Sequence, residues 1–156
     1  MKHKEVISKN KYDHIIQKLP YERPFLFVDE LLNINENRVE GCFTFSDTLS
    51  FYKGHFKGNP VTPGVILTEC CAQIGLVCLG IFLLDQEMQW KESSLKIGLS
   101  SSEMEFLLPV FPNEKVRVCS EKVYFRFNKL KCKVKMYNEA DKLVCKGSIS
   151  GMLTNT

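Results

Sequence analysis

The amino-acid sequence predicts an α+β fold in which one curved antiparallel sheet wraps around a single long helix. Residues 64–84 form an apolar run without proline, long enough for about six helical turns. On both sides of this run, apolar and polar residues alternate with a period of two, which is typical of strands buried on one face. A sheet with one apolar face must be covered, and a helix that is apolar all round must be enclosed. The two are therefore expected to pack together.

The segment before the apolar run predicts a short helix and a hairpin. Residues 9–18 (KNKYDHIIQK) are amphipathic and end just before a Leu-Pro pair, which is typical of a short helix. Residues 24–34 (PFLFVDELLNI) are apolar and predict a strand. The Asn-Glu-Asn of residues 35–37 predicts a turn, and the alternation over residues 38–46 predicts the paired strand.

The remaining segments predict a loop before the central helix and strands after it. Residues 51–63 are rich in glycine and proline and predict a loop, and the polar residues 85–94 predict a connection. Turn residues at 127–128 and 138–141 separate the last three strands. Period-two alternation predicts these strands over residues 95–110, 114–128, 129–138 and 142–153.

The chain has 156 residues, enough for one domain with a sizeable core. We expect a single domain over residues 1–156, with its core between about 19 and 153 and a polar N-terminal extension over 1–18. The net charge of +3 is too small to indicate a nucleic-acid-binding protein, although it suits an acidic protein partner. Met1–Lys11 is polar and basic and lacks the apolar segment of a secretory signal, so we expect a cytoplasmic protein.

The cysteines predict a reducing compartment. There are seven of them, an odd number, and no two are spaced as in CxxC, so they indicate neither a disulfide framework nor a zinc site. Several alternate with polar residues, where a cysteine acts as a small apolar side chain. This use of cysteine is typical of the cytoplasm, and we expect no metal.

The apolar run is also long enough to cross a bilayer. However, Glu69 and Gln73 lie inside it, and a charged side chain at the centre of a span costs about 2.5–3.5 kcal/mol. No cluster of Lys or Arg flanks either end of the run. A buried core helix is therefore favoured over a membrane span.

Two residues around the start of the apolar run are candidates for catalysis. His55 lies in the Gly-rich loop, and Glu69 lies 14 positions later inside the run. Each has an ordinary explanation on its own, because a loop histidine often packs or caps and a carboxylate in the first helical turns often reaches solvent. As a pair they combine histidine, the side chain best suited to taking a proton near neutral pH, with a carboxyl group that apolar surroundings keep neutral.

The start of the helix adds a third component. Pro63 and Gly64 predict the first helical turn, with Thr62 as a candidate N-cap. The first N–H groups of a helix have no partner within it and lie at its positive end, where they stabilise a developing oxyanion such as a thioester enolate. A base, an acid and oxyanion donors in one segment indicate abstraction of an α-proton with β-elimination.

Residues 54–73 (GHFKGNPVTPGVILTECCAQ) closely resemble the signature of the β-hydroxyacyl-acyl carrier protein dehydratases of the FabZ type. In that family a GHFPG-x-P…PG-V-x-x-x-E-x-x-AQ motif contains the catalytic His and Glu. Residues 19–29 (LPYERPFLFVD) look like the LPxxxPFLLVD segment of the family, and residues 107–116 (LLPVFPNEKV) look like its RPVxPGDxL segment. The resemblance covers roughly residues 19–153.

The resemblance implies the hotdog fold and a role for each site residue. His55 would be the base that takes the α-proton, and Glu69 the acid that protonates the leaving 3-hydroxyl. The backbone N–H groups of Gly64 and Val65 would hold the thioester carbonyl. Further contacts with the substrate are expected from Phe56, Pro63 and Gln73.

The resemblance also implies partners. The acyl chain would arrive on the phosphopantetheine arm of an acidic acyl carrier protein, and no metal or redox cofactor would take part. The chain would form a homodimer or a trimer of dimers, in which the His and the Glu of one site come from opposite subunits.

The sequence departs from the family pattern near the site but not at His55 or Glu69. Lys57 replaces a proline, and residues 21–22 (Tyr-Glu) and 107–108 (Leu-Leu) stand where the family often has His-Arg and Lys-Arg. Asn-Glu at 113–114 replaces Gly-Asp. These changes leave the acyl chain length and the pathway open, whether fatty acid synthesis or polyene or polyketide assembly.

Two other functions remain open at this point. A hotdog thioesterase also uses a carboxylate, but such enzymes lack the paired His and Glu motifs. A hotdog protein that has lost catalysis would bind acyl chains without changing them. Isomerising relatives tend to have Asp in place of Glu, so Glu69 favours dehydration without isomerisation.

Overall fold

The computed structural model describes residues 10–87 and 95–155. Six strands of the described residues form one antiparallel sheet in the order β1-β2-β4-β5-β6-β3. The strands are β1 (Glu30–Ile34), β2 (Arg38–Thr44), β3 (Leu95–Phe106), β4 (Lys115–Arg126), β5 (Lys129–Tyr137) and β6 (Leu143–Asn155). The helical segments are α1 (Asp13–Gln17), the 3-10 helix η1 (Ser50–Lys53), α2 (Gly64–Ala72), the π-helical η2 (Gln73–Cys78) and α3 (Leu79–Gln86).

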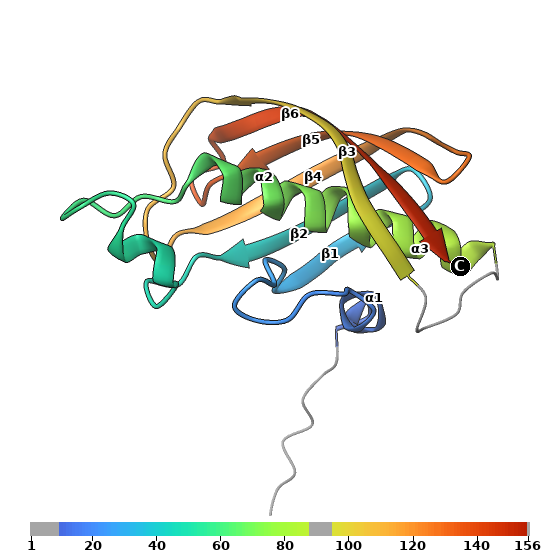
Figure 1. Cartoon of the computed structure of the whole chain (residues 1–156), viewed down its shortest axis with the longest axis horizontal. Coiled ribbons are helices and arrows are strands. Elements are labelled where there is room, and N and C mark those ends of the chain that lie inside the picture. The colour runs from blue at the N-terminus through green and yellow to red at the C-terminus, as the bar shows by residue number, and fades with distance from the viewer. Residues whose placement is uncertain (1–9, 88–94, 156) are drawn as a thin grey trace, which may run out of the picture.

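One continuous helix, made of α2, η2 and α3, crosses the concave face of the curved sheet (Figure 1). Every residue from Cys70 to Ile81 is buried. Among the described residues, the segment Gly64–Gln86 is the one helix long and apolar enough to cross a membrane, and 72% of its apolar window is buried inside the fold. This burial is that of a core helix, so the predicted sheet wrapped around a central helix is confirmed.

Strand β5 shows how the period-two pattern builds the core. Its apolar residues face the helix, and the lysines between them face away from it. The inward residues, each at most 1% exposed, are Leu130, Cys132, Val134 and Met136. Burying such side chains contributes about 1.5–3 kcal/mol each, which fixes the register of the strand.

The predicted strand over residues 24–34 is wrong in its first half, because only Glu30–Ile34 pairs with another strand. The Phe27 N–H donates to Gln73 Oε1 at 2.7 Å, and the Phe25 carbonyl accepts from Gln73 Nε2 at 2.9 Å. The backbone of this segment is therefore bonded to a helix side chain, and its apolar residues are buried as an extended loop.

Two other predicted boundaries differ from the structure. The N-terminal helix is limited to Asp13–Gln17, with Ile15 fully buried. The central helix continues to Gln86, beyond the predicted end at residue 84, and residues 88–94 of the predicted connection lie outside the described residues. The four later strands are confirmed.

The two edges of the sheet differ. At the β1 edge, Asn10 Nδ2 donates to the Leu31 carbonyl at 3.2 Å, so the N-terminal segment covers part of it. At the other edge, β3 is twelve residues long and nearly all of its side chains are exposed or half-exposed. A long exposed edge strand is a template for pairing with another chain.

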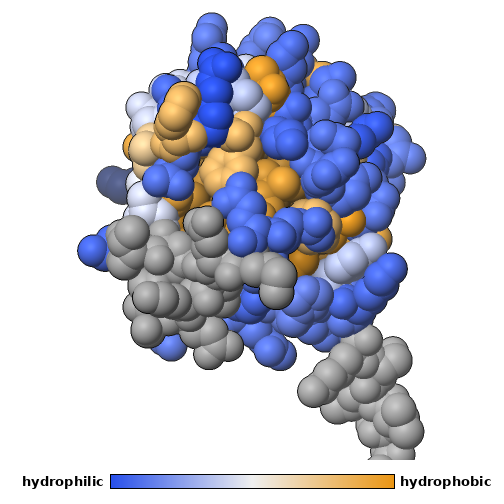
Figure 2. Space-filling model, turned by 90° about the vertical axis from the view of Figure 1, so that its right-hand side faces the viewer, coloured by the Kyte–Doolittle hydropathy of each residue, from blue (hydrophilic) through white to orange (hydrophobic). Residues whose placement is uncertain are grey.

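Figure 2 views the end of the molecule where β6 finishes and shows apolar atoms in a hollow ringed by hydrophilic residues.

All seven cysteines are free, and six of them are buried. Their burial within the core confirms that they serve as small apolar side chains.

Candidate active site

His55 lies in a tight loop between η1 and α2. Its N–H donates to the Phe51 carbonyl at 3.0 Å, and its carbonyl accepts from the Val61 N–H at 2.9 Å. Within this loop, Phe56 and Asn59 each donate a backbone N–H to the carbonyl of the other at 3.0 Å. Both sides of the His55 backbone are therefore fixed by hydrogen bonds, as expected of a residue that must present its side chain in one direction.

The ring of His55 has a defined tautomer. Its Nδ1 lies 2.8 Å from the Val61 carbonyl oxygen. Because a carbonyl oxygen only accepts, Nδ1 bears the hydrogen, and Nε2 of the neutral ring has a free lone pair. The ring stacks on Phe56, with the ring centroids 4.1 Å apart. The loop thus holds a histidine that is ready to accept a proton at Nε2.

The central helix starts at Gly64 with Pro63 in the N-cap position and no side-chain cap. The predicted Thr62 cap is wrong, because the Thr62 hydroxyl is hydrogen-bonded to the Tyr52 hydroxyl at 2.6 Å. Thr62 is 4% exposed, and its N–H donates to the Val110 carbonyl at 2.8 Å. Its polar groups are therefore used to attach the loop to the core.

The first N–H groups of α2 are available to a ligand. Ile66 and Leu67 already donate to the Pro63 carbonyl, at 2.9 and 3.1 Å. Within the described residues, the N–H groups of Gly64 and Val65 have no protein acceptor, as expected at the start of a helix. They lie at the positive end of the helix dipole, so the backbone there favours a negatively charged oxygen.

A groove of about 300 Å³ runs beside this helix start. It is lined by Thr62, Gly64 and Leu67 on one side and by residues 106–109 on the other. The Phe106 ring packs directly over Gly64, since a Cβ built on Gly64 would lie 3.4 Å from it. The missing side chain at Gly64 therefore lets an aromatic ring approach the free N–H groups.

Glu69 lies in the second turn of α2, half-buried, and Gln73 holds it in place. Gln73 Nε2 donates to Glu69 Oε1 at 3.0 Å and to the Phe25 carbonyl at 2.9 Å, while its Oε1 accepts from the Phe27 N–H at 2.7 Å. Gln73 itself is fully buried. Its predicted contact with substrate stays a prediction, and the observed contacts join Glu69 to the N-terminal segment.

Tyr21 is a neighbour of Glu69 and is not among the site residues predicted from the sequence. Burial raises the pKa of the Tyr21 phenol to about 12, and the charge of Glu69 adds to the shift. The phenol is therefore neutral at physiological pH and within electrostatic reach of Glu69. The one signal in the sequence was that a tyrosine stands where the resembled family often has histidine.

One chain does not bring the two candidate catalytic side chains into contact. In the described part of the chain, no hydrogen bond or ion pair joins His55 to Glu69. Val65 and Phe56, beside these residues, are 76% and 57% exposed. Within one chain, the two candidate residues are therefore separate, and each has an exposed apolar side chain nearby.

The described residues contain no group of three His, Cys, Asp or Glu side chains close enough together to hold a metal ion.

Comparison with known proteins relates this geometry to a family. Residues 19–149 match the protein-family model described as a FabA-like domain. A 3-hydroxyacyl-[acyl-carrier-protein] dehydratase FabZ of Caldicellulosiruptor saccharolyticus is 32% identical over 136 residues, which cover 86% of this chain and 92% of the relative. A FabZ dehydratase of Alkaliphilus metalliredigens is 31% identical over 145 residues, covering 90% of this chain and 92% of the relative.

Solved structures show the same fold at low sequence identity. An uncharacterized protein of Pyrococcus horikoshii, PH1136, superposes with a TM-score of 0.60 at 15% identity, covering 83% of this chain and 85% of that one. A hypothetical thioesterase of Streptococcus pneumoniae, solved with coenzyme A, gives a TM-score of 0.58 at 14% identity, covering 81% and 86%. At such identity the likeness concerns the fold alone.

Proposed function

The chain belongs to the FabA-like family, and on that premise we propose that it is a 3-hydroxyacyl-[acyl-carrier-protein] dehydratase. This lyase removes water from a 3-hydroxyacyl thioester to give the trans-2-enoyl thioester. The observation that carries the proposal is the orientation of His55 in the loop that precedes the central helix. Its Nδ1–H is bound to the Val61 carbonyl, which leaves Nε2 free to act as a base.

The proposed reaction starts at His55 and the helix start. Nε2 of His55 takes the α-proton of the acyl chain, and the electron pair moves onto the thioester carbonyl oxygen. The free N–H groups of Gly64 and Val65 stabilise that oxygen. Removing one such donor typically costs about 2.7–4 kcal/mol of transition-state stabilisation.

Glu69 completes the elimination. Its carboxyl group gives a proton to the 3-hydroxyl, the C–O bond breaks, and water leaves as the double bond forms. The proton taken by His55 returns to Glu69 through solvent, so the protein ends unchanged. The reaction is redox-neutral and moves only protons, so the proposed chemistry needs neither a metal nor a redox cofactor.

Gln73 acts as a positioning residue in this scheme. Its side chain uses three hydrogen bonds to hold Glu69, the Phe25 carbonyl and the Phe27 N–H together. An acid that must reach one oxygen of the substrate benefits from this fixed geometry.

The proposed active enzyme is a homodimer whose sites are shared between subunits. His55 and Glu69 do not meet within one chain, and β3 offers a long exposed edge that would extend the sheet into a second copy. The apolar residues 106–108, which follow that edge and are 37–48% exposed, would be covered in such a dimer. A trimer of such dimers is a further possible assembly of the same subunits.

The proposed substrate is a 3-hydroxyacyl group on an acyl carrier protein, as the names of the relatives state for those enzymes, and we place the acyl group on the phosphopantetheine arm of that carrier. The reaction would take place in the cytoplasm, within fatty acid synthesis or the assembly of polyenes or polyketides. Varying the chain length and unsaturation of the 3-hydroxyacyl group would distinguish these pathways.

A product analysis tests the proposed function. The protein would be mixed with a 3-hydroxyacyl thioester of an acyl carrier protein, and the products separated by mass. The proposal predicts an acyl product lighter by one water with the thioester intact. Free thiol and unchanged hydroxy acid would instead indicate a thioesterase, and an unchanged, bound thioester would indicate an acyl-binding protein.

A further inference from the structure

The positive charge of this protein is concentrated in one hairpin. Residues 115–137, which contain β4 and β5, have eight Lys or Arg and a single acid, Glu121. Their net charge is +7, whereas the whole chain has +3, so the remaining residues are net negative. A local excess of this size creates a positive surface potential that the overall charge hides.

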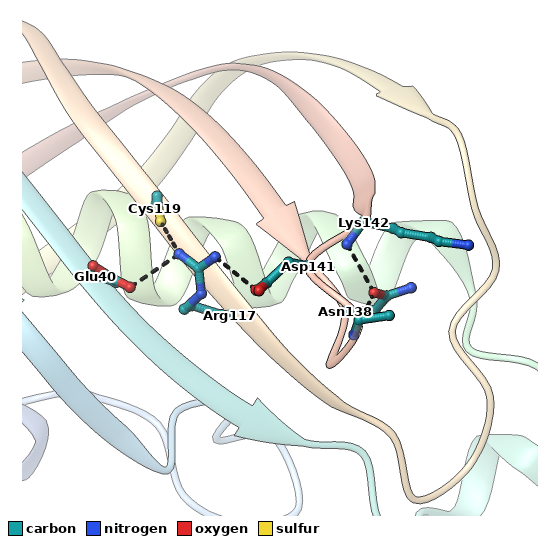
Figure 3. Close-up of polar contacts among 7 residues, drawn as sticks. Glu40, Arg117, Cys119, Asn138, Asp141 and Lys142 are labelled. Carbon is teal, nitrogen blue, oxygen red and sulfur yellow. Dashed lines mark hydrogen bonds and ion pairs between the residues drawn. The ribbon is translucent and has the colours of Figure 1, made fainter.

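Within the described residues, Arg117 is the one cation of this hairpin that forms ion pairs. Near the start of β4, Arg117 is paired with Glu40 at 3.1 Å and with Asp141 at 3.4 Å, on the face of the sheet away from the helix (Figure 3). Further along, Arg38 and Glu121 pair at 3.2 Å. In the described part of the chain no ion pair involves the four cations that lie on the outward face towards the turn, which are Arg126, Lys129, Lys131 and Lys133.

These unpaired cations share the outward face of the sheet. In β5 the lysines alternate with buried residues, and Lys131 lies opposite Tyr124 while Lys129 lies opposite Arg126. The Arg126 guanidinium stacks over the Tyr124 ring at 4.5 Å. On the neighbouring strand Met152 lies opposite Lys129 and is 40% exposed. Among the acids near this face, Glu121 lies opposite Lys133, Glu103 and Glu105 line a surface pocket together with Lys133, and Glu36 lies in the β1–β2 turn.

An exposed aromatic residue lies at the end of this face. Phe127 is 91% exposed, the highest value among the large apolar side chains of the described residues. It forms the β4–β5 turn with Asn128, and both have positive φ, 51° and 61°. Turns with two positive φ angles favour Asn and Gly, so local folding gives no reason for a phenylalanine there.

The turn is far from the proposed active site. The central helix starts beside Val110, before β4, and the turn follows the other end of that strand. The two lie at opposite ends of the molecule in Figure 1. The twelve residues of β4 span about 36 Å at about 3.3 Å per residue. The surface around Phe127 is therefore not part of the entrance to that site.

We propose that the β4–β5 turn and the outward face beside it dock on a bilayer containing anionic lipids. Phe127 enters the head-group region, where aromatic rings are favoured, and Arg126, Lys129 and Lys131 lie against the lipid phosphates. Three of these four outward cations are lysines, which act as point charges and suit a diffuse negative surface better than a single fixed carboxylate. Val123 and Met152 are exposed apolar side chains near these cations, and they suit the boundary between the lipid head groups and the acyl chains.

Sedimentation with lipid vesicles tests this proposal. Vesicles of phosphatidylcholine with phosphatidylglycerol would be compared with vesicles of phosphatidylcholine alone, at low and at high salt. The wild-type protein is expected to sediment only with the anionic vesicles and to be released by salt. Lys129→Gln with Lys131→Gln is expected to weaken binding about thirtyfold, from about 1 kcal/mol per cation. Phe127→Asn, which suits the positive φ, is expected to weaken it at least about tenfold.

Matched variants control for charge, apolar area and folding. Lys115→Gln with Lys142→Gln removes the same charge at the other end of the sheet, and Leu32→Asn removes an apolar side chain that is 44% exposed. Both are expected to bind vesicles as the wild type does, and every variant is checked for an unchanged melting temperature. The proposal is overturned by absent binding, by equal binding to neutral vesicles, or by equal losses in the control variants. Binding of an acidic carrier protein that depends on Phe127 would also overturn it, in favour of a protein partner.

Discussion

Gln73 connects the proposed acid to the segment that precedes β1. It is fully buried, and all three of its polar contacts are with protein atoms, one of them Glu69 Oε1. Gln73→Met keeps the length of the side chain but removes these hydrogen bonds. We expect kcat to fall about tenfold to a hundredfold, KM to change little, and the free energy of unfolding to fall by about 1–3 kcal/mol.

A second variant shows whether the loss of kcat in Gln73→Met comes from a displaced Glu69 or only from lower stability. Ser120→Ala removes another buried hydrogen bond to the same helix, from Ser120 Oγ to the Gly75 carbonyl at 2.8 Å. It is expected to lower stability but to leave the pH dependence of kcat unchanged. Gln73→Met is expected to change the pH dependence of kcat, because it removes the hydrogen bond to Glu69. If this pH dependence is also unchanged, Gln73 does not position the acid.

The Tyr21 phenol makes the free energy of unfolding depend on pH in the alkaline range. Burial raises the pKa of its phenol from 10.0 to about 12, with a further contribution from Glu69. Between these two values the unfolded chain has lost the proton while the folded chain keeps it, so stability falls as the pH rises from 10 to 12. The ring is only half-buried, so we expect a loss of about 1 kcal/mol.

The measurement is the free energy of unfolding in urea at pH 9 and pH 11, for the wild type and for Tyr21→Phe. The difference between the two proteins is the relevant quantity, because lysines and cysteines titrate in both. Tyr21→Phe should lose less stability than the wild type over this interval. Equal losses would show that the phenol is not held in its neutral form.

At the scale of elements, the helix packs tightly against the sheet at Gly75, within the π-helical segment η2. A Cβ on Gly75 would lie 2.9 Å from Val134 Cγ1 and 3.0 Å from Ser120 Cβ, so β4 and β5 leave no room for a methyl group. We expect Gly75→Ala to lower the free energy of unfolding by about 1–2 kcal/mol, since overpacking exceeds the gain in helix propensity. Thermal unfolding measures this as a fall of several degrees in Tm.

Gly54→Ala is the matched control for Gly75. A Cβ on Gly54 would meet nothing within 4 Å, and its φ of −114° is accessible to alanine. Its Tm should stay within about one degree of the wild type. A Gly75→Ala protein as stable as Gly54→Ala would mean that the helix can move away from the sheet without cost.

The elements that the sequence predicted correctly are those with strong periodicity. The apolar run and the alternating residues 114–153 specify the core helix and β4 to β6, because their pattern matches the face that is buried. Residues 24–29 are equally apolar but do not form a strand, since Gln73 takes the hydrogen bonds of Phe25 and Phe27. A side chain 46 positions away from Phe27 decided that outcome, and no local pattern contains such information.

At the scale of the whole molecule, the proposed mechanism requires two chains for one site. If His55 and Glu69 of a site come from opposite subunits, a mixed dimer of His55→Ala and Glu69→Gln has one intact site and one site lacking both residues. Mixing the two inactive proteins under conditions that exchange subunits should then restore about one quarter of the wild-type activity. Continued inactivity, with exchange confirmed by mass, would place both residues in the site of a single chain.

The site was predictable from the sequence only as a set of residues. The order of His55, Gly64 and Glu69 along the chain indicated a base, oxyanion donors and an acid. The sequence did not show that Thr62 bonds to Tyr52 instead of capping the helix. Nor did it show that the Val61 carbonyl selects the tautomer of His55. Both depend on the path of the loop, which its own glycines and prolines permit but do not determine.

The most direct test of the proposed dehydratase activity is hydration of a trans-2-enoyl thioester, the reverse of the proposed reaction. The enoyl absorbance would be followed with the wild type, His55→Ala and Glu69→Gln, each at the same protein concentration. The account predicts that absorbance falls with the wild type and that each variant is slower by at least about a hundredfold. A wild-type rate retained by either variant would contradict the assignment of base and acid, and no fall with the wild type across several chain lengths would contradict the dehydratase itself.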